Sequence, residues 1–333
     1  MRWIDMHCDT LSRLIQGEEG TLLQNKMCVD TKRLKKAGAS AQFFACFVNA
    51  KAERKETDIC EKGGGEVWDR AYREVEKMIC MAHEQEGKHL SFIQSEDQLD
   101  QTEREGKTAG ILTVEEGGIL NGQTERLEEL FQKGVRLITL TWNYENCLGS
   151  PNSRTPAVME RGLKKFGLET VERMNELGML IDVSHLSDGG FWDCIRKSRT
   201  PVVASHSNAR ALCAHPRNLS DDMLRALGNK GGVAGLNFYS PFLKVAHHGD
   251  APKANLEDLV RHAVWIVDRA GEDAAALGTD FDGFEQEALP RGICGVQDIG
   301  KLWEAFRRGG LTPRQIEKIA WRNVRRVLRE VCR

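Results

Sequence analysis

Short apolar runs alternate with longer amphipathic stretches along most of the chain. The apolar runs predict the strands Trp3–Cys8, Ala41–Val48, Gly110–Val114, Arg136–Thr141, Met179–Val183, Val202–Ser205, Gly232–Leu236 and Ala275–Gly278, with Leu90–Ile93 as a weaker candidate. Apolar residues at helical spacing predict the helices Glu66–Glu86, Arg126–Lys133, Lys164–Leu177, Asp221–Leu227, Leu256–Arg269, Thr312–Ile319 and Trp321–Val331. Such alternation is typical of a parallel sheet covered by helices. The strands without the weaker candidate match the number that closes a (β/α) barrel.

Polar residues, glycine and proline gather in the stretches that we predict as loops. These are Gly17–Thr31, Ala50–Gly65, Asn143–Gly162 and Ser240–Asn255. No linker-like segment interrupts the chain, and an α/β barrel of about 250 residues absorbs insertions in its loops. The 333 residues are therefore predicted to form a single domain, residues 1–333. We expect one (β/α)8 TIM-type barrel with loop insertions and C-terminal helices.

The charges of the chain nearly cancel, with 47 Lys and Arg against 49 Asp and Glu. A basic field of the kind that drives nucleic-acid binding is therefore missing. No apolar run approaches the ~18 residues of a membrane span, and we expect no secretion signal. The ten cysteines are dispersed, without the short paired spacings of a zinc knuckle or a disulfide scaffold. We predict a cytoplasmic protein with reduced thiols. Its partner should be a small molecule, and we expect it to bind neither nucleic acid nor membrane. A homodimer is possible.

Ionisable residues close several of the predicted strands. In barrel enzymes the active site gathers at the carboxyl ends of the strands, so these positions are candidates for chemistry. They are His7, Asp9, Glu115, Glu116, His185, His206, Asp280 and Asp282. One such histidine alone is more often a hydrogen-bonded loop residue than a ligand. Three of them in the same topological position favour a functional site.

Three imidazoles and two carboxylates from this set suit zinc or a neighbouring divalent metal. His7 and Asp9 stand two apart on an extended strand end, so both side chains can reach one ion. Five ligands exceed one open tetrahedral site and suit two ions that share a carboxylate. We assign this bridge to Glu116 and not Glu115, because two glycines follow it directly and permit a close approach of the backbone. The alternation of the strand does not decide between them.

The motifs together resemble the membrane dipeptidase (renal dipeptidase) family of zinc peptidases, in its soluble microbial form. The resemblance runs from Asp5-Met6-His7-Cys8-Asp9 to Asp280-Phe281-Asp282-Gly283. It implies that His7, Asp9 and Glu116 hold a first Zn2+. A second Zn2+ would share Glu116 and take His185 and His206. The expected protein is a binuclear zinc dipeptidase, a metalloprotease that cleaves dipeptides with a free C-terminal carboxylate through a metal-bridging hydroxide.

The resemblance also implies roles for residues around the two ions. Arg217 would grip the terminal carboxylate of the substrate, for which its planar guanidinium is suited. Asp280 would be catalytic together with Glu116, taking a proton from water and passing it to the leaving amine. Tyr239 would line the substrate pocket.

One position departs from the mammalian pattern. Where those enzymes have a histidine that polarises the scissile carbonyl, this chain has Trp142, whose indole donates only one neutral hydrogen bond. Asn143 or Tyr144 would supply another. We therefore expect Trp142 and Asn143 on the substrate side of the site.

Two alternatives remain open. The same ions would polarise any acyl oxygen, so the substrate could be a lactam, a lactone or a non-peptide amide. The chain could instead be a catalytically weak barrel that binds a metal or an amino-acid-like ligand, and the Trp142 departure supports this reading. Metal content and turnover of an Ala-Ala-type dipeptide separate the two.

Overall fold

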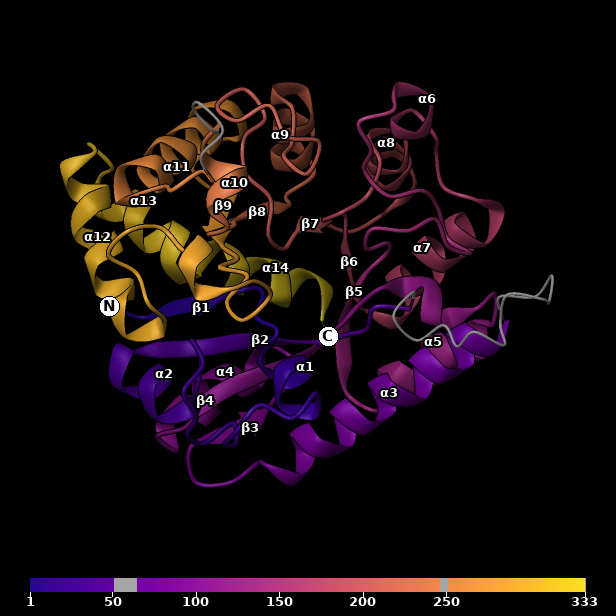
Figure 1. Ribbon diagram of the computed structural model, residues 1–333, viewed down its shortest axis with the longest axis horizontal. Helices are drawn as coiled ribbons and strands as arrows, with labels where there is room; N and C mark the ends of the chain where they lie inside the picture. Colours follow the sequence, from indigo (N-terminus) through magenta and orange to yellow (C-terminus); the bar gives the residue numbers. More distant parts are fainter. Residues whose placement is uncertain (51–64, 246–250, 333) are drawn as a thin grey trace.

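The computed structural model describes residues 1–50, 65–245 and 251–332. Its strands lie at the centre, and the helices surround them (Figure 1). The strands are β1 (Trp3–Asp5), β2 (Ala39–Phe47), β3 (Leu90–Phe92), β4 (Thr108–Glu115), β5 (Val135–Thr139), β6 (Leu180–Asp182), β7 (Val203–Ala204), β8 (Val233–Leu236) and β9 (Ala275–Leu277). Each pairing between neighbouring strands is parallel.

The strands form the predicted closed barrel. The ring runs β1, β2, β4, β5, β6, β7, β8 and β9, and β9 pairs with β1 again. Strand β3 lies outside the ring, because it pairs with the start of β4 while β5 pairs with the later part of the same edge. All predicted strands are present, and the weaker candidate Leu90–Ile93 corresponds to β3. The fold is a (β/α)8 barrel.

Most helices lie between the strands in sequence and cover the outside of the barrel. The helices are α1 (Thr10–Ile15), α2 (Thr31–Ala37), α3 (Gly65–Glu84), α4 (Asp97–Arg104), α5 (Thr124–Gln132), α6 (Pro156–Met159), α7 (Lys165–Leu177), α8 (Asp188–Lys197), α9 (Asp221–Asn229), α10 (Ser240–Leu243), α11 (Leu256–Ala270), α12 (Ile299–Arg308), α13 (Pro313–Glu317) and α14 (Asn323–Val331). The last ones, α12 to α14, follow the last strand of the barrel. Every predicted helix is present. The last two are joined by a π-helical turn, Lys318–Arg322.

The sequence prediction missed several helices. Helices α6 and α10 lie within the stretches predicted as the loops Asn143–Gly162 and Ser240–Asn255, and α1, α2, α4, α8 and α12 were not predicted. Some of them carry few buried positions, as in α4, where only Leu99 and Thr102 are buried, so their periodicity is weak. The predicted loop Ala50–Gly65 lies almost entirely outside the described residues.

Apolar side chains form two layers on the faces of the barrel. Alternate residues such as Ile4, Phe43 and Ile111 pack together in one buried cluster, while their neighbours such as Phe44 and Leu112 pack in the other. Because side chains of a strand alternate between its faces, the first cluster fills the barrel and the second lies under the helices. Four residues of α14 belong to the first cluster. Helix α14 therefore closes the amino-terminal end of the barrel, and the carboxyl ends of the strands lie at the other end.

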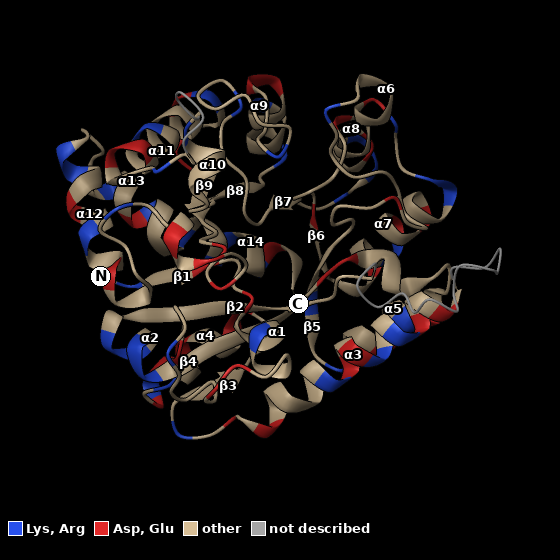
Figure 2. Ribbon diagram, viewed as in Figure 1, with Lys and Arg blue, Asp and Glu red and all other residues tan. Residues whose placement is uncertain are grey.

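The charged residues are spread over the outer helices. Figure 2 shows positive and negative segments interleaved along them, most clearly along α3. Within the part of the chain that the structure describes, no helix is both long and apolar enough to cross a membrane.

Candidate metal centre

The carboxyl ends of five strands bring six ionisable side chains together. His7 and Asp9 follow β1, Glu115 ends β4, His185 follows β6, His206 follows β7 and Asp280 follows β9. Each of these side chains except that of Asp280 is buried. The carboxyl ends of parallel strands meet at one end of a barrel, which explains why residues so far apart in sequence converge.

The ligand atoms of these side chains form overlapping groups. His7, Asp9 and Glu115 offer one set of atoms that lie within 4.8 Å of one another, and Glu115, His185 and His206 offer a second such set. Glu115 belongs to both. Its Oε2 lies 3.4 Å from His7 Nε2, whereas its Oε1 lies 3.1 Å from His185 Nε2 and 3.5 Å from His206 Nε2. A further set consists of His7, His206 and Asp280.

A hydrogen-bonded chain behind His206 fixes which ring nitrogen carries its proton. Asp182 accepts a hydrogen bond of 2.6 Å from Ser205 Oγ, so the Ser205 oxygen is left to accept from His206 Nδ1 at 2.7 Å. Asp182 also accepts from the backbone N–H groups of Ser184 and Ser205 and from Thr139 Oγ1. The proton of His206 therefore lies on Nδ1, and the lone pair of Nε2 faces the cluster. Such support of a ligand histidine is common at metal sites.

His185 is oriented in the same way by Asn143. The Asn143 Oδ1 atom lies 3.2 Å from His185 Nδ1, which places the proton on that nitrogen. The Nε2 atoms of His185 and His206 then face each other at 3.0 Å, with two lone pairs and no proton between them. A cation bound by both nitrogens would satisfy this arrangement.

The carboxylates of the cluster also suit a bound cation. Among the described residues, Asp9 Oδ1 is buried without a hydrogen-bond partner, although buried carboxylate oxygens normally have one. The Asp280 side chain is only 15% exposed, and this partial burial raises its pKa to about 7, with the charges of Asp9 and Glu115 adding to the shift. Burial also opposes ionisation of Glu115, but His7 and the other histidines hold its pKa well below the usual range. Several acids in a small buried volume are favourable when they share a divalent cation.

Glu116 does not take the position that the sequence analysis gave it. Its carboxylate accepts hydrogen bonds from Asn146 Nδ2 at 2.6 Å, Gly118 N at 2.9 Å and Trp142 N at 3.3 Å. The structure places Glu115, and not the expected Glu116, between the two groups of candidate ligand atoms, because β4 extends through Glu115 and adjacent residues of a strand face opposite sides. The glycines that suggested Glu116 serve another purpose. A Cβ at Gly117 would lie 2.6 Å from Leu148 Cδ1, so glycine there lets the loop after β5 approach.

A cavity of about 200 Å³ opens beside the cluster. Asp9, Glu115, His185 and Asp280 line it together with the aromatic residues Phe47, Trp142, Tyr239, Phe242 and Phe284. The Trp142 ring packs against Phe47 with 4.8 Å between ring centroids. Trp142 and Tyr239 thus lie on the cavity as expected, while Asn143 instead holds His185 from outside. Sequence reasoning missed Phe47, Phe242 and Phe284, because aromatic residues that line a cavity do not differ in sequence from core residues.

Arg217 is buried close to the cluster. Its Nη1 donates to Ser207 Oγ and its Nη2 to the His206 carbonyl, each at 3.2 Å. Its Nε has no partner among the described residues, none of which forms an ion pair with it either. Burial lowers the pKa of the guanidinium to about 10, against the charges of Asp280 and Glu115. A buried cation without a counterion is rare and suggests that a ligand supplies the anion.

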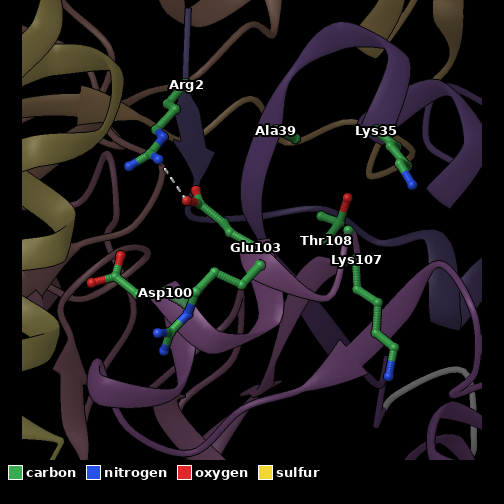
Figure 3. A pocket seen from close by; sticks show the side chains of 9 residues that line it. Arg2, Lys35, Ala39, Asp100, Glu103, Lys107 and Thr108 are labelled. Carbon is green, nitrogen blue, oxygen red and sulfur yellow. Dashed lines mark hydrogen bonds and ion pairs between the residues drawn. The ribbon is translucent and has the colours of Figure 1, made fainter.

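A larger cavity, of about 670 Å³, lies at the opposite end of the barrel. It opens beside the first residues of β2 and β4, Ala39 and Thr108 (Figure 3). Its acidic groups are paired, since Arg2 contacts Glu103 at 3.0 Å and Arg325 contacts Asp100 at 2.7 Å. The amino-terminal face of such barrels serves stability, and catalysis occurs at the carboxyl ends.

A (β/α)8 barrel whose strand ends hold three histidines and three carboxylates has the layout of a metal-dependent hydrolase. The model of the family described as membrane dipeptidase (peptidase family M19) matches residues 1–333. The chain belongs to this family.

Relatives and solved structures agree with this assignment. An uncharacterized dipeptidase of Schizosaccharomyces pombe is 30% identical over 306 residues, which cover 90% of this chain and 71% of that protein. The crystal structure of dipeptidase AC, a metallopeptidase of family M19, superposes with a TM-score of 0.84 at 26% identity over 100% of this chain and 99% of that one. A metallopeptidase from Rhodobacter sphaeroides, solved with a phosphinate mimic of the dipeptide L-Ala-D-Ala, gives a TM-score of 0.83 at 25% identity over 99% of both chains. The protein is a dipeptidase of this metallopeptidase family.

Proposed function

We propose that the protein is a binuclear zinc dipeptidase that cleaves dipeptides carrying a free C-terminal carboxylate. The observation that carries this proposal is the position of Glu115. One of its oxygens faces His7, and the other faces His185 and His206. A carboxylate shared in this way is how two-metal hydrolases hold ions about 3.5–4 Å apart.

The donor set suits zinc. His7, Asp9 and Glu115 would hold one ion, and Glu115, His185 and His206 would hold the other. Imidazole nitrogens with carboxylate oxygens are typical zinc ligands, and neither group has enough ligands to close the coordination shell. Bound at this place, the ions would supply Lewis-acid activation of water and of the scissile carbonyl.

Asp280 would move the proton. Asn237 Nδ2 donates to its Oδ2 at 2.8 Å, which leaves Oδ1, 3.9 Å from His7 Nε2, directed at the cluster. At Oδ1 it would take a proton from the attacking water and release it to the leaving amine. General acid–base transfer of this kind contributes about 10²–10⁴ in rate.

Arg217 would bind the terminal carboxylate of the substrate. Its guanidinium is buried, and no described carboxylate pairs with it. The aromatic lining of the cavity would then surround the apolar parts of a short peptide. A cavity of about 200 Å³ favours dipeptides of small residues, and the R. sphaeroides relative was solved with a phosphinate mimic of such a dipeptide, L-Ala-D-Ala.

The test combines metal analysis with kinetics. Purified protein is expected to contain two zinc ions per chain and to hydrolyse L,L- or L,D-alanyl-alanine, assayed with zinc, manganese and cobalt. Glu115→Gln should lose metal and activity together, because a neutral amide cannot bridge two cations. A wild-type protein that binds divalent metal but cleaves only lactams or non-peptide amides would overturn the dipeptide assignment. A Glu115→Gln variant that keeps two ions would overturn the bridge.

A further inference from the structure

Glu116 is a buried carboxylate whose backbone lies in an unfavourable conformation. Its side chain is 0% exposed, and its φ of 96° lies in the region that residues other than glycine rarely adopt. Strain of this kind costs on the order of 1–3 kcal/mol and persists where the surrounding structure enforces it, commonly at functional sites. Glycine would relieve the strain, so the glutamate side chain must provide something that glycine lacks.

The side chain holds the loop that follows β5. Glu116 Oε2 accepts from the backbone N–H of Trp142, and Oε1 accepts from Asn146 Nδ2. Asn146 is saturated in turn, because its Nδ2 also donates to the Leu140 carbonyl and its Oδ1 accepts from the backbone N–H of Leu148. Trp142 is thus tied to the carboxylate directly, and both ends of residues 140–149 are tied to it through Asn146.

This loop carries two residues that contact the site. The Trp142 side chain lines the cavity beside the metal ligands, and Asn143 Oδ1 accepts from His185 Nδ1. The backbone of the first is bonded directly to Glu116, and the second follows it in sequence. We propose that Glu116 is a positioning residue, which holds residues 140–149 so that Trp142 borders the bound substrate and Asn143 keeps His185 in its ligand orientation.

This inference rests on the proposed dipeptidase activity for its kinetic consequences, but it predicts a change in the loop that needs no substrate. In Glu116→Gln the amide can keep one oxygen toward Asn146 and Gly118. Its NH2 then faces the Trp142 N–H, and two donors cannot bond. The bond to Trp142 is lost while the packing volume stays the same. Glu116→Gly removes all three bonds but permits the φ of 96°.

The experiment compares metal-loaded wild-type protein with Glu116→Gln, Glu116→Gly and a matched control, Glu96→Gln. Glu96 is likewise a buried carboxylate, but it pairs with Arg325 and Arg329 of α14 at the other end of the barrel. Hydrogen–deuterium exchange of the peptide covering residues 140–149 is measured first. We expect exchange at least ten times faster in both Glu116 variants and unchanged exchange in the control. Equal exchange in all proteins would overturn the inference, whatever the activity.

Metal content and kinetics with alanyl-alanine follow. In Glu116→Gln, KM should rise about tenfold and kcat should change less, because Trp142 lines the cavity that would hold the substrate and Glu116 does not. A double variant with Trp142→Ala should be no worse than Trp142→Ala alone in KM, since the two residues act through one contact. Weaker binding of the ion expected at His185 would support the role through Asn143, whereas additive effects on KM would refute the positioning role. A wild-type protein without peptidase activity would refute the proposed function alone, and the exchange result would still decide on Glu116.

Discussion

Replacing Arg217 with methionine is expected to lower activity on dipeptides and to raise the stability of the fold. Burial lowers the pKa of this guanidinium from 12.5 to about 10, even with the charges of Asp280, Glu115 and Asp182 in its favour. Because one pKa unit corresponds to about 1.4 kcal/mol, the charge costs the folded protein roughly 3 kcal/mol. Bound cations would increase this cost.

The kinetic consequence depends on the charge of the substrate. Removing one partner of a buried charge pair costs about 2–5 kcal/mol, so kcat/KM for a dipeptide should fall by tens to thousands. The C-terminal amide of the same dipeptide lacks the charge, so kcat/KM for this amide should fall little. The assay compares both substrates with wild-type protein and Arg217→Met. Equal losses on the two substrates would mean that Arg217 only supports its loop.

The stability consequence is measured by denaturant unfolding. Arg217→Met should raise the free energy of unfolding by up to about 3 kcal/mol, since methionine fills similar space without a charge. The His206 carbonyl that loses the Arg217 donor keeps Asn237 Nδ2 at 3.4 Å. Arg217→Lys is the matched control, because it retains the buried charge and should not be stabilised. A destabilised methionine variant would contradict the reasoning.

Further predictions concern Asp280, Asp182 and His262. Asp280→Asn should retain both metal ions while kcat falls by about 10²–10⁴, and an unchanged kcat across pH would remove it from the mechanism. Asp182→Asn should weaken metal binding about 10–100-fold in a chelator competition, because an amide cannot accept from all four donors around it; unchanged affinity would exclude this support. Burial lowers the pKa of His262 from 6.5 to about 4, so the unfolded chain binds its proton more readily. Its contribution to the free energy of unfolding is complete above pH 6.5 and falls by roughly 3 kcal/mol as pH drops toward 4. The free energy of unfolding of His262→Gln should therefore fall less over that range. An equal fall in the wild-type protein and the variant would contradict this.

The barrel could be predicted from the sequence because its strands are buried on both faces. Such strands appear as continuous apolar runs, and the observed strands all lie at predicted runs. Candidate ligands could be found by the same route, since His7, His185 and His206 each lie at the end of one of those runs or within two residues after it. The lining of the cavity could not, because Phe47 and Phe242 resemble core residues until the fold brings them together.

The choice between Glu115 and Glu116 depended on where a strand ends. Within β4, Ala109 and Ile111 face the barrel interior, and Leu112 and Val114 face the helices. Glu115 continues the interior series if the strand includes it, as it does. The sequence prediction ended this strand at Val114, so the alternation could not be applied to the next residue. Strand ends are the least certain part of such predictions, and here one residue decided which carboxylate faces the candidate metal ligands.

Strained backbone conformations occur at the carboxyl ends of the barrel strands and could not be predicted from the sequence. Among the described residues, those other than glycine with positive φ include Glu116, His185, Asp280 and Asp282, each just after a barrel strand. Glycine would adopt these conformations without cost, but it has no imidazole or carboxylate. His185 and Asp280 need their side chains for the cluster, and Asp282 uses its carboxylate to accept from Thr10 Oγ1 and Cys28 N. Glu116 shares the strain without contacting the histidines. That combination indicates that its side chain is kept for the loop beside the substrate cavity.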